Sequence, residues 1–579
     1  MLQKMKYLKV IMLLTIVATI ISCSSKKKGL ESMIPEDAKI VVGINAGKLM
    51  EKLAANGISG DSIPLGLMSL TADDAANKPV AKFLNGLDTI GIDFAQPIYM
   101  AISASKDVTV PYATLRVIAK VTDKAKVTKM LKNNKMDVQE RNGLTFVTTL
   151  TDERDNAAIG YDGTYIVLAK DMPLNELMNS GTRGLIKGNG AQLKDYTPLN
   201  AKQLEDIVVA TFSKKTKSIT DNKDFNKMPV GTNDIKIWYD MGYFIQKAQS
   251  ENQFAQIGTR IFKDLFDGCS TTTTINFENG KVAAYNELYY NDSVSAIINR
   301  AASKTIDLNL LSSFPGTQLN GVYAMSADPS MLLNFAKFVK GDGIMNIALE
   351  QLQLTTEDVF KTFSGDVLIA VADLNAQSYT TSKAENLNIG LIAKVANKDV
   401  LAKIMAIPDI AKSIKLANNI YTMQSTNNEP TYITIVNDVL LLTPNKKMAD
   451  DFNAGKKMTI SPTIIENLTG KSAGYYIDAA SIVKSLSEAY KPMLAGYIST
   501  TKLSSISSII KETYMSSGKF TGNSVATQGY LILDNTTQNS LAYMIKQGVV
   551  VAKEVITTRA AFNSLDEEDD AKIKPMPIN

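Results

Sequence analysis

The sequence contains no histidine and only two cysteines among its 579 residues. Without histidine, Ser-His-Asp and Cys-His catalysis, zinc sites built on imidazole and imidazole pH switching are all excluded. If Cys23 is modified, Cys269 has no second cysteine in the chain with which to form a disulfide. With no histidine to activate its thiol, Cys269 is expected to be a small buried apolar residue.

Motifs for cofactors, metals and nucleophiles are also scarce. The chain has no G-x-x-x-x-G-K-[ST] loop, and Gly188-Asn189-Gly190 lacks the third glycine of a dinucleotide loop. Residues 221–224 have oxygen ligands without the spacing of a calcium loop. Ser481 and Lys484 form an isolated S-x-x-K without its usual partner motifs. We therefore expect no catalytic residue, no cofactor and no metal site, and the sequence favours a protein that is not an enzyme.

The charge balance points away from nucleic acid. The formal net charge is +4, and three of the positive charges are Lys4, Lys6 and Lys9, so the remaining chain carries 4 − 3 = +1. That is too little for a surface that follows a phosphate backbone. With 45% hydrophobic and 21% charged residues, the composition is that of a globular protein, and the length predicts at least two domains.

The first residues predict a lipoprotein signal peptide over 1–22. Lysines are followed by an apolar stretch from Val10 to Ile21, which is short for a membrane span, and then by Ile20-Ile21-Ser22-Cys23. This ending resembles the lipobox of bacterial lipoproteins and predicts that Cys23 is acylated, for example with palmitate, and anchors the chain to a membrane. Residues 23–33 then form the acylated cysteine and its polar tether.

The residues after Cys23 predict the location. Ser24 resembles the residue found in lipoproteins sent to the outer membrane, whereas Lys26–Lys28 are basic where surface-export signals are acidic. We therefore expect a lipid anchor in the outer membrane of the cell envelope, with the periplasmic face favoured over the cell surface.

A strand–turn–helix pattern recurs along the chain. It is clearest at Ile40–Leu53, where an apolar run is followed by a helical stripe that includes Leu49 and Leu53. The same pattern returns three times, at Lys236–Ala248, Gly321–Val339 and Ala473–Leu486.

Colinear matches between the two halves predict an internal duplication. The tetrapeptide Ile118–Val121 is repeated at Ile392–Val395, within longer matching segments that occur in the same order. We expect a first repeat domain at 34–300 and a second at 306–550. The first carries an insertion at Ser180–Asn233, interpreted as a surface loop or as a binding lid. Residues 565–579 are charged and are expected to form a disordered tail.

Two-residue turns between several apolar runs require antiparallel pairing. The predicted fold class is therefore α+β: two tandem copies of a mainly antiparallel sheet with helices packed on one face. Aromatic side chains provide candidates for a ligand-binding face that could stack on sugars or hold a peptide. Alternation along the strands favours a structural role for most of them. The candidates are Trp238, Tyr239, Tyr243, Tyr285 and Tyr289, with Tyr290 beside them.

The acylated start, the phrase I-P-E-D-A-K-I-V-V-G-I-N at Ile34–Asn45 and the duplicated layout resemble Bacteroidetes lipoproteins grouped as domain of unknown function 4836. This resemblance covers nearly all of the mature chain. It implies no reaction and no catalytic residues, and the one position that it assigns is the lipidated Cys23.

Three hypotheses for function follow from the sequence. The preferred one is a membrane-anchored, non-enzymatic envelope protein that binds a protein, peptide or glycan ligand through one sheet face. The second is a hydrolase of the glycosidase type, acting on envelope or dietary glycans with carboxylates alone, which would need two facing carboxylates about 5–10 Å apart. The third is a purely structural envelope component.

Overall fold

The fold is that of a computed structural model. It describes residues 29–58, 90–104, 112–133, 136–141, 143–149, 157–173, 199–213, 217–229, 231, 233–244, 265–299, 304–339, 341–350, 352–380, 384–424, 429–491 and 509–548. Cys23, the first part of the expected insertion and the tail at 565–579 lie outside these residues.

The chain divides into two compact units, Met1–Ala46 with Asp88–Met228, and Gly47–Leu87 with Pro229–Asn579. Each unit is described by itself below. The repeat domains predicted at 34–300 and 306–550 have other boundaries, and they stay a prediction.

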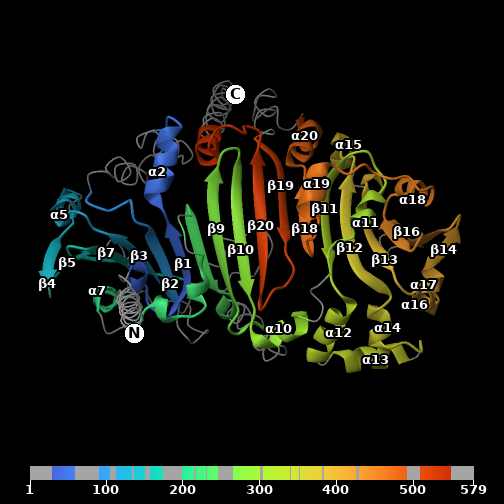
Figure 1. Ribbon diagram of the computed structural model, residues 1–579, viewed down its shortest axis with the longest axis horizontal. Helices are drawn as coiled ribbons and strands as arrows, with labels where there is room; N and C mark the ends of the chain where they lie inside the picture. The colour runs from blue at the N-terminus through green and yellow to red at the C-terminus, as the bar shows by residue number, and fades with distance from the viewer. Residues whose placement is uncertain are drawn as a thin grey trace, which may run out of the picture. The chain divides into compact units, whose positions relative to one another are not determined.

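In its described residues, the first unit is built on seven antiparallel strands (Figure 1). Neighbouring strands pair in the order β1-β2-β3-β7-β6-β5-β4. The strands are β1 (Ala38–Ile44), β2 (Ile98–Ala104), β3 (Tyr112–Lys120), β4 (Val138–Arg141), β5 (Leu144–Thr149), β6 (Ala157–Tyr161) and β7 (Tyr165–Pro173). The helices and 3-10 turns are η1 (Leu30–Met33), α5 (Lys124–Asn133), α7 (Ala201–Phe212), η3 (Ile219–Asp221) and η4 (Phe225–Lys227).

The strands of the second unit pair in the order β8-β9-β10-β20-β19-β18-β11-β12-β13-β17-β16-β15-β14, and every pairing is antiparallel. The strands are β8 (Ile235–Asp240), β9 (Ser270–Glu278), β10 (Lys281–Tyr289), β11 (Leu319–Ser326), β12 (Phe363–Ala372), β13 (Ile389–Val395), β14 (Ile414–Ala417), β15 (Ile420–Gln424), β16 (Pro430–Val436), β17 (Val439–Thr443), β18 (Ala473–Ile477), β19 (Ile510–Ser517) and β20 (Ser524–Leu533).

Short helices connect these strands. They are α2 (Ala46–Ala55, all but its first residue in this unit), α10 (Asp292–Asn299), α11 (Leu308–Ser312), α12 (Pro329–Phe338), α13 (Asp342–Glu350), α14 (Thr356–Phe360), α15 (Ala376–Thr380), η6 (Ala384–Asn386), α16 (Lys398–Met405), α17 (Pro408–Ser413), α18 (Lys446–Asn453), α19 (Pro462–Leu468) and α20 (Ala479–Ala489). In the described part of the chain, no helix is long and apolar enough to cross a membrane.

The strand order β11-β12-β13-β17-β16-β15-β14 repeats the order β1-β2-β3-β7-β6-β5-β4 of the first unit. Helix α16 follows β13 as α5 follows β3. This agreement is what the two-copy interpretation requires. The predicted α+β class with mainly antiparallel pairing is confirmed.

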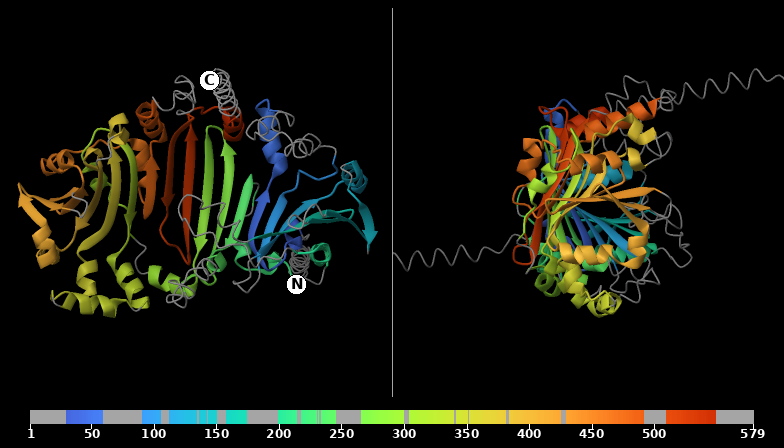
Figure 2. Two further views of the ribbon diagram at one scale, coloured as in Figure 1. Left: turned by 180° about the vertical axis from the view of Figure 1, so that it is seen from behind. Right: turned by 90° about the vertical axis from the view of Figure 1, so that its right-hand side faces the viewer.

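The main core of the second unit lies on one face of its strands. Ile392 of β13 and Leu441 of β17 are fully buried there against Phe314. Met448 and Phe452 of α18 and Leu311 of α11 cover this face, and Figure 1 shows α11 in front of β12 and β13. The left view of Figure 2 shows the same strands from behind.

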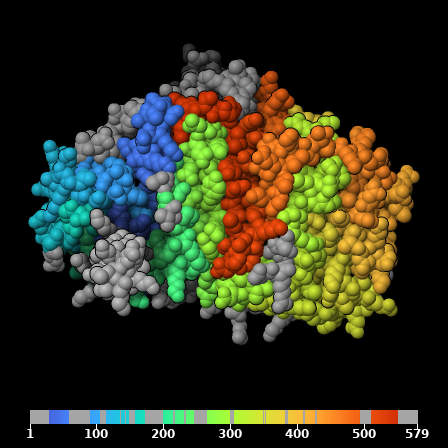
Figure 3. All heavy atoms as spheres, viewed as in Figure 1, coloured from blue at the N-terminus to red at the C-terminus, as the bar shows by residue number. Residues whose placement is uncertain are grey.

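On that opposite face a second, partial helical layer is formed by α16, whose Leu401 packs against Ile433 and Leu440. Because neighbours along a strand point to opposite faces, Leu440 and Leu441 belong to different layers. The space-filling view of Figure 3 looks onto the side of α11, and the green and red atoms of β10 and β20 lie side by side on this surface.

Helix α7 lies within the segment that the sequence assigned to a surface insertion, Ser180–Asn233. It is a packed element of the first unit, because Leu204 and Val208 are fully buried and α7 contacts β5, β6 and β7. A capping box between Asn200 and Gln203 fixes its start. In the second unit α18 contacts β15, β16 and β17 in the same way, so this part of the segment has a counterpart and is no loop.

Candidate apolar binding site

The second unit contains a cavity of about 780 Å³ on the face of the strands opposite its main core. Strands β11, β12, β13, β15, β16 and β17 form its floor, and α12, α14 and α16 form its walls. Twenty residues line it, and Lys398 is the one among them that carries a charge. A volume of this size falls in the range of roughly 300–1,000 Å³ that is usual for small-molecule sites.

The wall next to β11 is shaped by a close backbone contact. Ala327 and Gly365 both line the cavity, and a Cβ atom on Gly365 would lie 1.7 Å from the carbonyl oxygen of Ala327. Gly365 also has a φ of 99°, a value that favours glycine. Asp328 then caps α12 by accepting a hydrogen bond from Ser330 N at 2.9 Å. Hydrogen bonds from Ser330 and the nearby Lys304 and Lys361 lower the pKa of the Asp328 carboxyl.

Two further caps hold the other walls. Thr355 and Asp358 form a capping box that starts α14, which contributes Val359 and Phe360 to the lining. Asn397 accepts hydrogen bonds from Asp399 N and Val400 N and so starts α16. Each wall is therefore positioned by polar groups that point away from the apolar space.

The equivalent residues of the first unit are fully or almost fully buried. The separation in sequence that relates Ile118 to Ile392 also relates Leu131 to Met405 and Tyr161 to Ile435, and the strand registers agree with it. In the first unit Val127, Leu131, Val147 and Tyr161 form one packed cluster, with Tyr161 fully buried. In the second unit the equivalent residues Leu401, Met405, Tyr421 and Ile435 line the cavity.

Two exchanges account for much of the difference in packing. The Tyr161 hydroxyl lies 2.8 Å from Thr128 Oγ1 on α5, so ring and hydroxyl together bridge strand and helix. The second unit has Ile435 and Ala402 at these positions. These exchanges remove the bridge between strand and helix, while Tyr421 brings a ring to the position of Val147.

The rim of the cavity carries an ion pair. Lys398 forms a salt bridge with Asp438 in the turn between β16 and β17, and their side chains are 65% and 53% exposed. Such an exposed pair contributes little to stability. It nevertheless places an ammonium group beside an apolar cavity, where a ligand with an apolar chain and an anionic end would present its charge.

The aromatic candidates do not form one exposed face. Trp238, Tyr243 and Tyr289 are buried, at 1%, 6% and 9% exposure. Tyr239 lies against the ring of Phe244, and burial raises its pKa. Tyr285, 43% exposed, has its hydroxyl 3.0 Å from that of Tyr530 across β10 and β20. This is the arrangement expected of core residues and cross-strand pairs, and none of these residues lines the apolar cavity.

Cys269 is buried at 1% exposure, and its thiol donates to the Leu265 carbonyl oxygen at 3.4 Å, so its expected burial is confirmed. Within the described residues, no three acidic or cysteine side chains gather as metal ligands.

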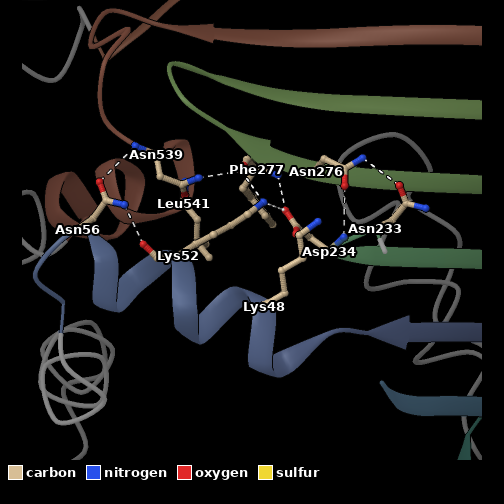
Figure 4. A network of polar contacts seen from close by, with 9 residues as sticks. All are labelled: Lys48, Lys52, Asn56, Asn233, Asp234, Asn276, Phe277, Asn539 and Leu541. Atoms are coloured by element: carbon tan, nitrogen blue, oxygen red, sulfur yellow. Dashed lines mark hydrogen bonds and ion pairs between the residues drawn. The ribbon is translucent and has the colours of Figure 1, made fainter. Parts of the chain in front are cut away.

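A buried polar network of the second unit connects segments that are far apart in the sequence (Figure 4). Asp234 is fully buried, and Lys48 and Lys52 of α2 reach it at 3.2 Å and 2.5 Å. The same carboxylate accepts from Phe277 N at 2.6 Å, and Asn539 Nδ2 donates to the Phe277 carbonyl oxygen. Through these contacts the network joins α2, β9 and Asn539, which directly precedes the helix at 540–548.

Sequence reasoning missed the cavity, because its residues have the pattern of ordinary core positions. It also passed over Arg116, a charged residue between apolar neighbours in the middle of β3. Alternation along β3 places Arg116 on the same face as Ile118, which is fully buried. The signal that could have identified it is the alignment of the repeats, where Gly390 stands at the equivalent position.

No protein-family model matches the chain, and no curated protein matches it. Among solved structures, crystal forms I, III and IV of a protein titled TP0453 are similar to 46%, 48% and 45% of this chain. These matches span 80%, 88% and 80% of those chains, with identities of 9%, 8% and 9% and TM-scores of 0.21, 0.24 and 0.24. Similarity at this level carries no argument about fold or function.

Proposed function

We propose that this chain is a lipid-anchored, non-enzymatic protein of the bacterial cell envelope that binds an apolar, chain-bearing ligand in the cavity of its second unit. The observation that carries the proposal is the cavity of about 780 Å³ with a single charged lining residue. A pocket that is open to solvent leaves apolar side chains in contact with water, so an apolar occupant that covers them is favoured. The predicted acylation of Cys23 would place the protein at a membrane, where aliphatic molecules are available.

The lining chemistry favours an aliphatic ligand over a sugar. Glycan sites need several side-chain hydrogen-bond donors and acceptors, and among the lining residues these are limited to Lys398 and Tyr421. A carboxylate-only hydrolase would need two facing carboxylates, and no Asp or Glu is found among the described residues that line the cavity. The hydrolase and the purely structural component stay alternatives, without a specific observation in their favour.

The proposal is tested by titrating the purified chain with the fluorescent fatty acid cis-parinarate and displacing it with saturated fatty acids of increasing length. Each buried methylene is worth about 0.8 kcal/mol, so affinity should rise up to about fourfold per added carbon until the cavity is filled. Saturable binding with this dependence supports the proposal. An absence of saturable binding, together with no aliphatic molecule in solvent extracts of the native protein, would overturn it.

The anchor is tested separately by Cys23→Ala. The variant should no longer carry label from radioactive palmitate and should leave the membrane fraction, because the acyl chains provide the membrane affinity. A Ser24→Ala variant, which keeps the cysteine, serves as the matched control. If Cys23→Ala still fractionates with membranes and still incorporates palmitate, the predicted lipidation site is wrong.

A further inference from the structure

The first unit contains a second cavity, of about 440 Å³, with a different chemistry. It lies between the segment before β1, the middle of β3 and the end of α7. Four charged side chains line it, from Glu36, Asp37, Arg116 and Lys217, together with the hydroxyls of Ser32 and Thr211. The apolar cavity of the second unit has one charge, so the two cavities suit different ligands.

Arg116 is the unusual member of this lining, because it is only 8% exposed. Its Nη1 donates to Ser103 Oγ at 2.8 Å, and Ser103 Oγ donates to Asp37 Oδ1 at 2.9 Å. Its Nε has no acceptor among the described residues. A guanidinium has five N–H donors, and a buried one is costly unless they are satisfied. Burial lowers the pKa of Arg116, while the charge of Asp37 raises it.

The second unit shows that the fold does not need a charge here. Gly390 occupies the position of Arg116, and Ala372 occupies that of Ser103 by strand register. A Cβ on Gly390 would lie 2.8 Å from Leu441 Cδ1 and 3.1 Å from Phe314 Cε2, so packed apolar side chains fill that space. A buried arginine that replaces such packing points to a ligand as the reason for the charge.

We infer that this pocket binds the carboxylate group of a small molecule through the Arg116 guanidinium, whose planar fork matches a carboxylate. Ser103 and Asp37 hold the guanidinium from one side. Lys217, 76% exposed and 3.9 Å from Glu36, lies in a loose pair that can open to contact the ligand. The carboxylates of Glu36 and Asp37 repel a second negative charge, so a singly charged carboxylate binds better than a phosphate dianion.

The experiment measures thermal unfolding of the full chain in acetate, in phosphate and in chloride at constant ionic strength. A ligand that binds only the folded state raises Tm, by about 1–3 °C when its concentration is roughly tenfold above Kd. We expect acetate to raise Tm relative to chloride and phosphate to do so less. Equilibrium dialysis with radioactive acetate should give one site per chain.

Arg116→Gln should abolish both effects, and Lys217→Ala, at an exposed position, should weaken acetate binding several-fold with an unchanged Tm in chloride. Lys202→Ala, which removes an exposed lysine of α7 outside the pocket, is the matched control and should leave acetate binding unchanged. If Arg116→Gln fails to fold, the Lys217→Ala and Lys202→Ala pair decides. Equal acetate effects in all variants, no acetate effect in the unmodified chain, or a preference for phosphate would overturn the inference.

Discussion

Helix α5 in the first unit and helix α16 in the second follow equivalent strands, yet they meet those strands differently. Under α5, Tyr161 bridges to Thr128 and the cluster around it is closed. Under α16, Ile435 and Ala402 leave the space open. At Arg116 and Gly390 the difference is reversed, because there the first unit is open and polar and the second is packed. The same strand order therefore accommodates a polar site in the first unit and an apolar site in the second. The volumes of a few side chains decide which of these two spaces is filled in each unit.

The largest expected loss of stability comes from removing a side chain of the packed cluster in the first unit. Leu131, 2% exposed, belongs to the packed cluster, so Leu131→Ala should lower the free energy of unfolding by about 2–5 kcal/mol. Its counterpart Met405 is only partly buried and lines the cavity, so Met405→Ala should cost less than Leu131→Ala. Urea unfolding followed by circular dichroism measures both. Equal costs would mean that the space under α16 is as closed as that under α5.

The next largest loss of stability is expected at Gly390, the packed counterpart of Arg116. Gly390→Ala forces a Cβ against Leu441, Phe314 and the carbonyl oxygen of Leu442, which lies 3.3 Å away, so it should destabilise the chain by about 1–3 kcal/mol. As a control, Gly343→Ala adds a Cβ in open space and should change stability little. A neutral Gly390→Ala would show that the apolar packing at this position is loose and that the contrast with Arg116 is overstated.

Some features of this molecule, such as the equivalent strands, could be predicted from the sequence, and others, such as the cavity, could not. The repeat of Ile118–Val121 at Ile392–Val395 predicted equivalent strands, and their pairing partners agree. The cavity could not be predicted, because Ile435, Leu401 and Met405 obey the same apolar pattern as a filled core. A pattern records which side chains are apolar and not whether their volumes meet. Arg116 was visible as a charge within an apolar strand, but its burial depends on how other segments, such as η1, pack on β3.

The most direct test of ligand binding is to introduce residues of the packed cluster in the first unit at the equivalent positions of the cavity in the second unit. The double substitution Ile435→Tyr with Ala402→Thr introduces the pair formed by Tyr161 and Thr128, so it should place a bridging ring inside the cavity and weaken fatty-acid binding at least about tenfold, which is 1.4 kcal/mol. Thermal unfolding should show no loss of stability.

The matched control is Tyr161→Phe, which removes only the hydroxyl contact in the first unit. It should cost about 1 kcal/mol of stability and leave binding unchanged. If the variant with both Ile435→Tyr and Ala402→Thr binds as tightly as the unmodified chain, the ligand does not occupy this cavity.

The smallest expected effect concerns the charge at the rim. Lys398 and its counterpart Lys124 each pair with an exposed carboxylate, Asp438 and Glu140, and Lys398 lines the apolar cavity. Because an exposed charge pair is worth about 0.2–1 kcal/mol, Lys398→Ala should weaken binding of palmitate by at most about fivefold. It should leave binding of the uncharged hexadecanol unchanged, and Lys124→Ala should alter neither. The loss for palmitate should shrink as salt is raised, because ions screen the rim charge. Equal losses for the acid and the alcohol would show that Lys398 acts by packing its aliphatic stem, and the ligand would then need no anionic end.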